Sequence, residues 1–211
     1  MLQRKSRSML RALAATTCVL GVGVVAITRD TASAHEPWAV ATLRDANGGR
    51  IGSVAFEDDD DSPNRTEVTV RLRRVAAVES FHGLHIHAND AAGNGDGCLA
   101  DGSQPSTTWF VSADGHWKHD PTELHGNHAG DLPSVFVNAD GSSIARFVVD
   151  KLTASEVVGR AVVLHVAPDN FGNVPVGGAT DQYTPGATAL AKTQATGNAG
   201  DRYACGVISD H

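Results

Sequence analysis

The sequence predicts an all-β fold, a sandwich or barrel of about eight short antiparallel strands with two long functional loops. Three observations support this class. Short segments alternate apolar and polar residues, turn-forming residues separate these segments, and no helix-period segment of useful length competes with them. The chain has 211 residues, of which 41% are hydrophobic, so it is long enough to bury a proper core in one domain.

Three consecutive strands are expected first, at 38–44, 50–56 and 66–73. The turn at 45–49, with sequence DANGG, separates the first two, and the acidic segment 57–64 separates the second from the third. The acidic segment can be interpreted as a calcium site, but a solvated hairpin turn is the simpler interpretation. These strands therefore form the first antiparallel sheet of the prediction.

Five further strands complete the predicted sheet. They are expected at 81–88, 134–140, 143–149, 160–166 and 203–208. The dipeptide Asp140-Gly141 predicts a tight hairpin between two of them. Two segments without strand character, 89–133 and 167–202, are rich in Gly, Asn, Asp and Thr. Because compact domains rarely keep such long loops without a use, we expect both to serve the function.

The N-terminus is typical of an export signal. Four basic residues precede the apolar run 12–28, and Ala32 and Ala34 form the small-residue pattern that signal peptidase recognises. We therefore expect a signal peptide at 1–34 and a single functional domain at 35–211.

Two alternatives to cleavage are open. The run 12–28 could remain as a membrane anchor, but it is short for a bilayer core of about 30 Å. A lipid could be attached at Cys18, although the residues before it form a poor lipid-attachment motif. We expect export to the cell exterior, the periplasm or the envelope, with no stable membrane insertion of the mature form.

The charge of the chain limits its partners. The formal net charge is −7, and loss of the leader removes five of the 17 basic residues and one of the 24 acidic ones, which leaves about −11. Such a charge argues against nucleic acid or anionic membrane as partners, because both require clustered Lys and Arg. An anionic substrate would need local positive charge.

The cysteines predict a disulfide. Cys18 leaves with the signal peptide, so an exported domain keeps Cys98 and Cys205. An even pair in an oxidising compartment favours a bond between them. Two free buried thiols are the alternative.

Histidines predict a metal site. Eight of the ten lie between His82 and His165. His85 and His87 are two residues apart on a predicted strand, so their side chains leave the same face roughly 7 Å apart and can bind one metal ion. His165 lies in another apolar strand. A single such histidine would be interpreted as a hydrogen-bonded core residue, but the three together favour a metal site.

The first long loop adds four more histidines and an aspartate within sixteen residues. They are His116, His119, His125, His128 and Asp131. Imidazole suits copper and zinc, and histidines completed by one aspartate suit tetrahedral zinc. A polar surface loop that chelates metals only incidentally is the alternative.

Six motifs, in order, carry a family resemblance. They are FHGLHIH, GDGC, GH, HAGDL, GRAVVLH and TGNAGDRYACGVI. From about Trp38 to Ile208 the sequence resembles the copper–zinc superoxide dismutase family. The resemblance implies a Greek-key β-barrel and an enzyme that converts two superoxide ions to oxygen and hydrogen peroxide by cycling Cu(II) and Cu(I). It further implies one copper and one zinc per subunit, and it allows a homodimer.

The resemblance also assigns roles to residues. It implies copper ligands at His85, His87, His116 and His165. It implies zinc ligands at His116, His125, His128 and Asp131. It matches Cys98 and Cys205 to the family's disulfide, Arg202 to an arginine beside the copper, and Asp169 to a carboxylate that links ligands of the two metals. It implies that His116 bridges the metals and delivers a proton during catalysis, and that His82 is structural. Lys192 is a weaker candidate for guiding the substrate.

The zinc segment departs from the family pattern. Only two residues separate His125 from His128, and the segment between His116 and His125 is stretched and contains His119. A site with copper alone, or with His119 as a substitute zinc ligand, is therefore an alternative.

A second class of function is an exported copper- and zinc-binding module without turnover. A storage module has no need of an anion guide, so the combination of Arg202 with an open copper face would favour the enzyme.

Overall fold

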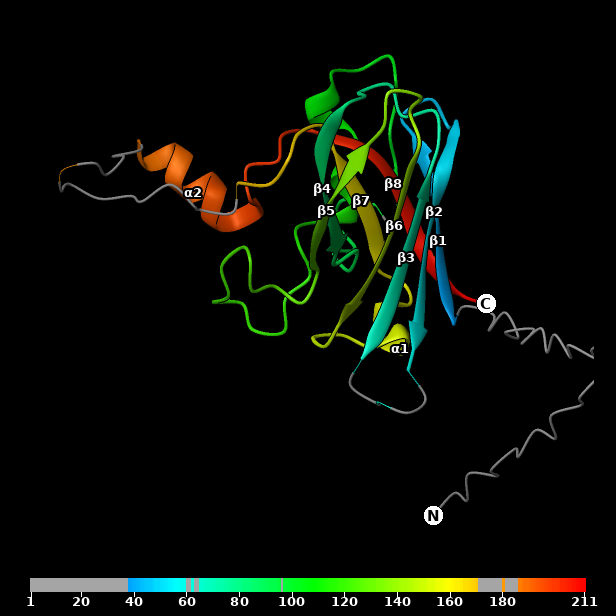
Figure 1. Cartoon of the computed structure of the whole chain (residues 1–211). Coiled ribbons are helices and arrows are strands. Elements are labelled where there is room, and N and C mark those ends of the chain that lie inside the picture. The colour runs from blue at the N-terminus through cyan, green and yellow to red at the C-terminus, as the bar shows by residue number, and fades with distance from the viewer. Residues whose placement is uncertain (1–37, 60–61, 63–64, 96, 171–179, 181–185) are drawn as a thin grey trace, which may run out of the picture. The chain divides into compact units, whose positions relative to one another are not determined.

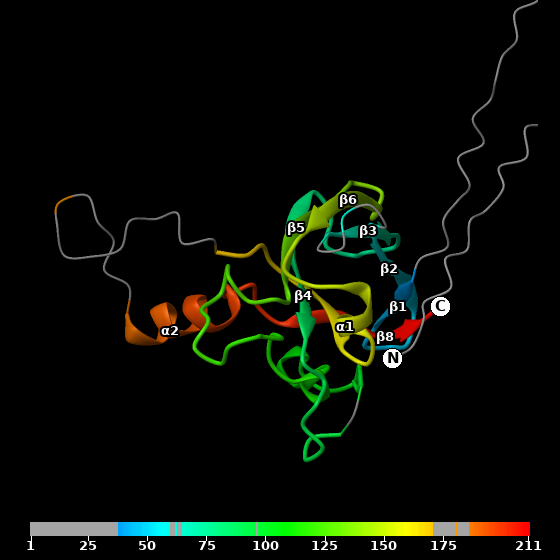
Figure 2. The same ribbon diagram turned by 90° about the horizontal axis from the view of Figure 1, so that it is seen from below.

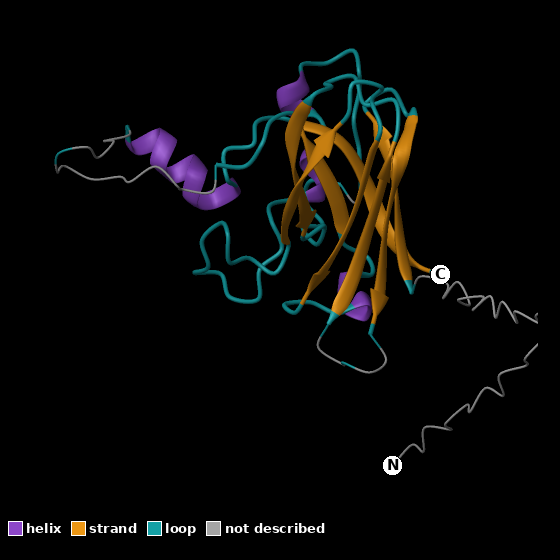
Figure 3. Cartoon of the chain, viewed as in Figure 1, coloured by secondary structure: helices purple, strands orange, loops and turns teal. Residues whose placement is uncertain are grey.

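Eight antiparallel strands build the part of the molecule that the structure describes. The computed structural model describes residues 38–59, 62, 65–95, 97–170, 180 and 186–211, which belong to one compact unit, and the expected signal peptide lies outside them. The strands are β1 (Ala39–Asp45), β2 (Arg50–Asp58), β3 (Thr66–Leu72), β4 (Ser80–His87), β5 (Asp131–Val137), β6 (Ser143–Val149), β7 (Ala161–His165) and β8 (Arg202–Asp210). Each overlaps a segment predicted from the sequence (Figures 1 and 3).

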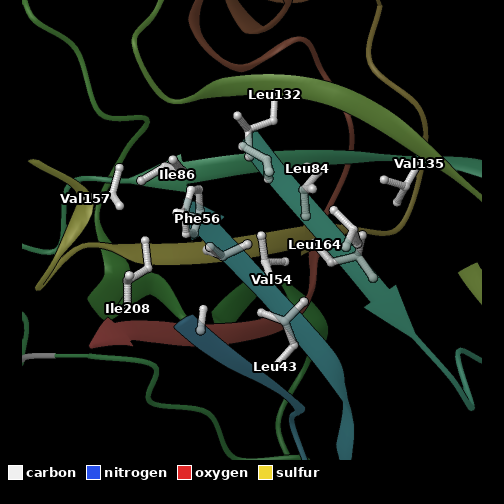
Figure 4. Packing of buried hydrophobic residues seen from close by; sticks show 14 of the residues in the cluster. Leu43, Val54, Phe56, Leu84, Ile86, Leu132, Val135, Val157, Leu164 and Ile208 are labelled. Carbon is white, nitrogen blue, oxygen red and sulfur yellow. The ribbon is translucent and has the colours of Figure 1, made fainter. Parts of the chain in front are cut away.

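The sheet order is β5-β4-β7-β8-β1-β2-β3-β6, which curls into a nearly closed Greek-key barrel. The predicted all-β class is therefore confirmed. Along β3, every second residue from Thr66 to Leu72 is buried, as the alternating sequence requires. Inward side chains such as Leu43, Phe56 and Leu164 fill the barrel (Figure 4).

The turn between β5 and β6 is present, but the two strands do not form a hairpin. The Asn138 amide donates to Ser142 O at 2.8 Å, and Gly141 has φ +76°. However, β5 pairs with β4 and β6 with β3, so these strands are the two ends of the sheet order. The dipeptide Asp140-Gly141 thus predicted the local turn correctly. It predicted the pairing of the two strands wrongly, because after this turn the chain continues at the opposite end of the sheet order.

Two α-helices occur in the described residues where the sequence analysis expected none. Helix α1 (Ala154–Val157) begins with a capping box between Thr153 and Glu156. Helix α2 (Ala187–Thr196) lies inside the second long loop and ends at Gly197, with φ +64°. None of the residues of α2 is buried, so it lacks the apolar stripe by which a helix is detected in a sequence. Among the described residues, neither helix has the length and apolar character to span a bilayer.

The first long loop packs on the outside of the barrel. The expected disulfide joins Cys98 in this loop to Cys205 on β8, with Cα atoms 5.5 Å apart. A second small core forms beneath it, where Phe110 and Ala113 pack against Val163 of β7. The loop is therefore fixed to the barrel just before it supplies His116.

Candidate metal centre

Four buried histidines converge at one side of the barrel. His85 and His87 lie on β4, and His165 is the last residue of β7, which pairs with β4. His116 comes from the first long loop, where its backbone forms an isolated β-bridge with His87. One ligand nitrogen from each lies within 4.8 Å of the others. We call these residues the four-histidine set.

Hydrogen bonds fix the proton positions in this set. His87 Nδ1 lies 2.8 Å from Asp114 O, and His165 Nδ1 lies 3.0 Å from Gly200 O. Because a carbonyl oxygen only accepts, both nitrogens carry the hydrogen and the opposite nitrogens hold lone pairs. His85 Nε2 likewise lies 2.9 Å from Asp169 Oδ1.

The remaining nitrogens are buried and have no hydrogen-bond partner among the described residues. They are His85 Nδ1, His87 Nε2, His116 Nε2 and His165 Nε2. Unpaired buried nitrogen atoms are costly, and four that face one another fit a cation that accepts their lone pairs. Imidazole nitrogen is a good ligand for copper, so the donor set fits that metal.

Burial keeps these rings neutral. It lowers the pKa of His165 to about 4, and it holds the pKa values of His85 and His87 well below their ordinary range, with a further contribution from His116. Neutral imidazole is the form that binds metal, so the environment prepares the ligands.

A second set surrounds Asp131, the first residue of β5. Asp131 Oδ1 lies 2.8 Å from His116 Nδ1 and 3.2 Å from the Nδ1 atoms of both His125 and His128. His116 Nδ1 and His128 Nδ1 are 3.3 Å apart. Tetrahedral zinc with bonds of about 2.0–2.1 Å separates its ligand atoms by about 3.3 Å, and these four distances are close to that value. The second group of potential ligand atoms within 4.8 Å of one another contains His116, His125 and Asp131 together with His85, and His128 joins them through its contacts with Asp131 and His116. We call His116, His125, His128 and Asp131 the loop set.

The shortened segment between His125 and His128 therefore still delivers both rings. His128 Nε2 donates to Glu123 O at 3.0 Å, which leaves its Nδ1 lone pair toward Asp131. Although burial raises the pKa of Asp131, hydrogen bonds with His116 and His125 outweigh it and bring the pKa well below its usual range. Asp131 is thus ionised, the form in which a carboxylate can bind a metal ion.

His119 belongs to neither set. Its side chain is 49% exposed, its ring packs edge-on against Trp117, and its Nε2 lies 4.0 Å from Glu156 Oε1. The alternative that His119 replaces a zinc ligand is therefore wrong for this structure. His82 instead bonds through Nδ1 to His165 O at 2.7 Å, as expected of a structural histidine.

Asp169 lies between the two sets. Its Oδ1 is 2.9 Å from His85 Nε2 and 3.6 Å from His125 Nε2. Ser134 Oγ donates to its other oxygen at 3.3 Å. Gly197 packs so closely on this pair that an added Cβ would collide with His125 and Asp169. The expected link between the sets is therefore present as a geometric contact.

Arg202 lies beside the four-histidine set, where it pairs in register with His165. Its guanidinium donates to the carbonyl oxygens of Phe110 and Asp114, and Asp114 O also accepts from His87. Burial lowers its pKa, partly offset by Asp114, but an arginine stays charged. Two of its five N–H groups are used by these carbonyls, so others can meet an anion. Lys192 is exposed on α2.

Several supporting contacts had no signal in the sequence. Lys151 Nζ donates to His128 O at 2.8 Å, and Lys118 Nζ donates to Glu123 O at 2.9 Å. The His125 amide donates to Gln194 O of α2 at 2.7 Å. Backbone carbonyls accept each of these bonds, so residue type at the acceptor carries no clue to them.

Comparison with known proteins agrees with this geometry. The family described as copper/zinc superoxide dismutase matches residues 50–208. Curated relatives named "Superoxide dismutase [Cu-Zn]" include one from Mycobacterium tuberculosis, 31% identical over 176 residues, which covers 80% of this chain and 68% of the relative. Others come from Photobacterium leiognathi, 33% identical over 76% of this chain and 80% of the relative, and Francisella tularensis, 28% identical over 83% of each.

Proposed function

Because this chain belongs to the copper/zinc superoxide dismutase family, we propose that the four-histidine set binds its copper, that the loop set binds its zinc, and that Arg202 guides superoxide to the copper. The protein is a superoxide dismutase, an oxidoreductase that uses copper and zinc to convert two superoxide ions and two protons into oxygen and hydrogen peroxide.

One observation carries the copper assignment. His85 Nδ1 and the Nε2 atoms of His87, His116 and His165 are buried without a hydrogen-bond partner in the described part of the chain, and one nitrogen of each ring lies within 4.8 Å of the others. When bound there, copper supplies a one-electron carrier that is stable in two oxidation states, which zinc cannot be.

Arg202 supplies the local positive charge that an acidic enzyme needs in order to attract an anionic substrate. Its guanidinium is held by two backbone carbonyls, so it has a fixed position beside His165. A fixed cation in a partly buried setting attracts an anion more strongly than an exposed one. We infer that the remaining N–H groups of Arg202 orient superoxide.

His116 links the two sets through its two nitrogens. Its Nδ1 lies against Asp131, and its Nε2 faces the other histidines. Zinc on Nδ1 would hold the ring in place, so Nε2 is the atom that takes up a proton and passes it to the reduced oxygen. The second proton for hydrogen peroxide comes from solvent.

Metal analysis and activity together test the proposal. We expect the metal-loaded protein to hold one copper and one zinc by mass spectrometry and to accelerate superoxide loss in a cytochrome c competition assay. A loaded protein without activity would instead favour the metal-binding module without turnover. In a His116→Ala variant, zinc that stays fully bound would contradict the bridging role.

We further propose export, with cleavage after Ala34. The disulfide and the N-terminal pattern both support an oxidising destination. Mass spectrometry of the protein made in a bacterial host should give a chain that begins at His35. A retained leader in the mature protein would contradict cleavage. Sedimentation of the same sample tests the homodimer that the family resemblance allows.

A further inference from the structure

Arginines gather on the outer face of β1–β3 at the end that carries the β1–β2 turn. Arg44 on β1 and Arg50 on β2 are direct partners across the ladder. Arg73 follows β3, and its amide donates to Ile51 O at 2.7 Å, next to Arg50. Arg71 lies two residues earlier on the same strand. All four are exposed, and we call them the arginine face.

The side chains of the arginine face point outward in two rows. Arg44, Arg50 and Arg73 form one row on three neighbouring segments. In the other row Arg71 pairs with Ser53, and Ser53 pairs with Thr42 on β1. Neighbouring strands are about 4.8 Å apart and residues i and i+2 about 7 Å apart, so the four guanidinium groups can reach one ligand together.

These arginines lack carboxylate partners. Within the described part of the chain, no carboxylate oxygen forms an ion pair with any of the four, and the Arg44 Nη1 bond to Gly48 O, at 2.9 Å, is to a backbone carbonyl. Like charges directly across a ladder, such as Arg44 and Arg50, are destabilising. The molecule therefore keeps an arrangement that is unfavourable without an anion.

Some of the other basic residues have partners. Arg146 pairs with Glu67 at 2.6 Å, Arg160 stacks on Trp117 at 4.0 Å, and Lys151 bonds to His128 O. Arg65, Arg74 and Lys192 are also exposed, but the arginine face brings four exposed arginines together on adjoining segments. The net charge argued against polyanionic partners, but it does not show where on the surface the positive charges lie.

A hollow adjoins the face. A cavity of about 290 Å³ is lined by Thr42, Arg44 and Asp45 together with Cys98, Phe110 and Val207. It lies between β1 and the loop that carries the disulfide. Arg44 therefore borders this hollow beside Asp45, so we expect an anion to lie over the arginines and not within the hollow.

The arginine face is separate from the metal centre. Figures 1 and 2 show β1–β3 on the side of the barrel away from α2, which contacts the loop set through Gln194. None of the four arginines belongs to either metal set, so we expect binding there to be compatible with turnover.

We propose that the arginine face binds a linear phosphate polymer of the cell envelope and so retains the exported enzyme there. The planar guanidinium fork matches phosphate oxygens in pairs, and all four residues are arginine, not lysine. Single-stranded nucleic acid is disfavoured, because the residues of the face include no aromatic side chain on which bases could stack. The hydroxyls of Ser53 and Thr42 offer further donors between the arginines.

Inorganic polyphosphate is the probe. We expect the purified protein to bind it in titration calorimetry, and we expect Arg50→Gln/Arg73→Gln to weaken binding roughly tenfold or more. The slope of the logarithm of affinity against that of salt concentration should fall by about 1 for each arginine removed. The matched control, Arg65→Gln/Lys192→Gln, removes two exposed charges elsewhere and should bind as the wild type does.

Two further measurements keep the test clear. Polyphosphate should raise the unfolding temperature of the wild type but not that of the double variant, and both should dismutate superoxide equally. Absence of binding at low salt, equal weakening in the control, or tighter binding to single-stranded DNA or to phosphatidylglycerol vesicles than to polyphosphate would each overturn the proposal. Self-association of the wild type by light scattering, without polyphosphate binding, would show that the face meets a second copy instead.

Discussion

The two metal sets are held in different ways. Three of the four-histidine set lie on β4 and β7, whose ladder register fixes their spacing. Three of the loop set lie on a loop, where Lys151 donates to His128 O and the carbonyls of Glu123 and Gln194 accept from His128 Nε2 and the His125 amide. The barrel therefore positions most of the four-histidine set, whereas individual side-chain and backbone bonds position the loop set. Substitutions should separate these two kinds of support.

The largest effect is expected from removal of a strand ligand. His85→Ala should lose copper and reduce activity roughly 100-fold or more while zinc stays bound. Loss of a residue that only contacts a metal ligand already lowers metal affinity 10–100-fold, and we expect His85 to bind the metal itself. His125→Ala should lose zinc and keep copper. Metal content by mass spectrometry, beside the cytochrome c assay, checks both. Loss of both metals from either variant would show that the sets are not separable.

Arg202→Ala should have the next largest effect. It removes the fixed charge beside the strand ligands, so we expect the second-order rate to fall roughly tenfold and to depend less on ionic strength. Stopped-flow measurement across a salt series checks this. Arg65→Ala, which removes an exposed charge given no role in guidance, is the control. Equal salt slopes in wild type and Arg202→Ala would remove Arg202 from the guiding role.

Lys151→Met should weaken zinc binding by the loop set and leave the four-histidine set unchanged. Its ammonium bonds to His128 O, so its loss should speed zinc release to a chelator by about tenfold, in the range of outer contacts to metal ligands. Copper content should stay unchanged. Lys192→Met, an exposed change on α2, provides the control. Unchanged zinc release would mean that the loop keeps its shape without this bond.

The smallest effect is expected at His119. The side chain is half exposed and outside both sets, so His119→Gln should leave zinc content and activity unchanged. It should alter the free energy of unfolding by less than about 0.5 kcal/mol. Metal analysis and thermal unfolding measure it. Zinc loss in this variant would restore His119 as a ligand.

The sequence predicted the strands, and with them the four-histidine set, better than it predicted the loop set. Alternation along segments such as Thr66–Leu72 carries period-two information, and His85 and His87 inherit their common face from it. It could not predict that β5 and β6 separate, because barrel closure depends on long-range pairing. Nor could it predict α2, whose residues are all outside the core, or the arginine face, which depends on register between Arg44 and Arg50.

The carbonyl of Asp114 accepts from both His87 and Arg202. Its residue has φ +67°, and its carboxylate is held by the amides of Asp90 and Ala91. A rotation of this one peptide would therefore move two side chains together, His87 as a proposed copper ligand and Arg202 as the proposed guide for superoxide. A substitution that shifts this carbonyl is expected to change both anion attraction and the environment of the copper.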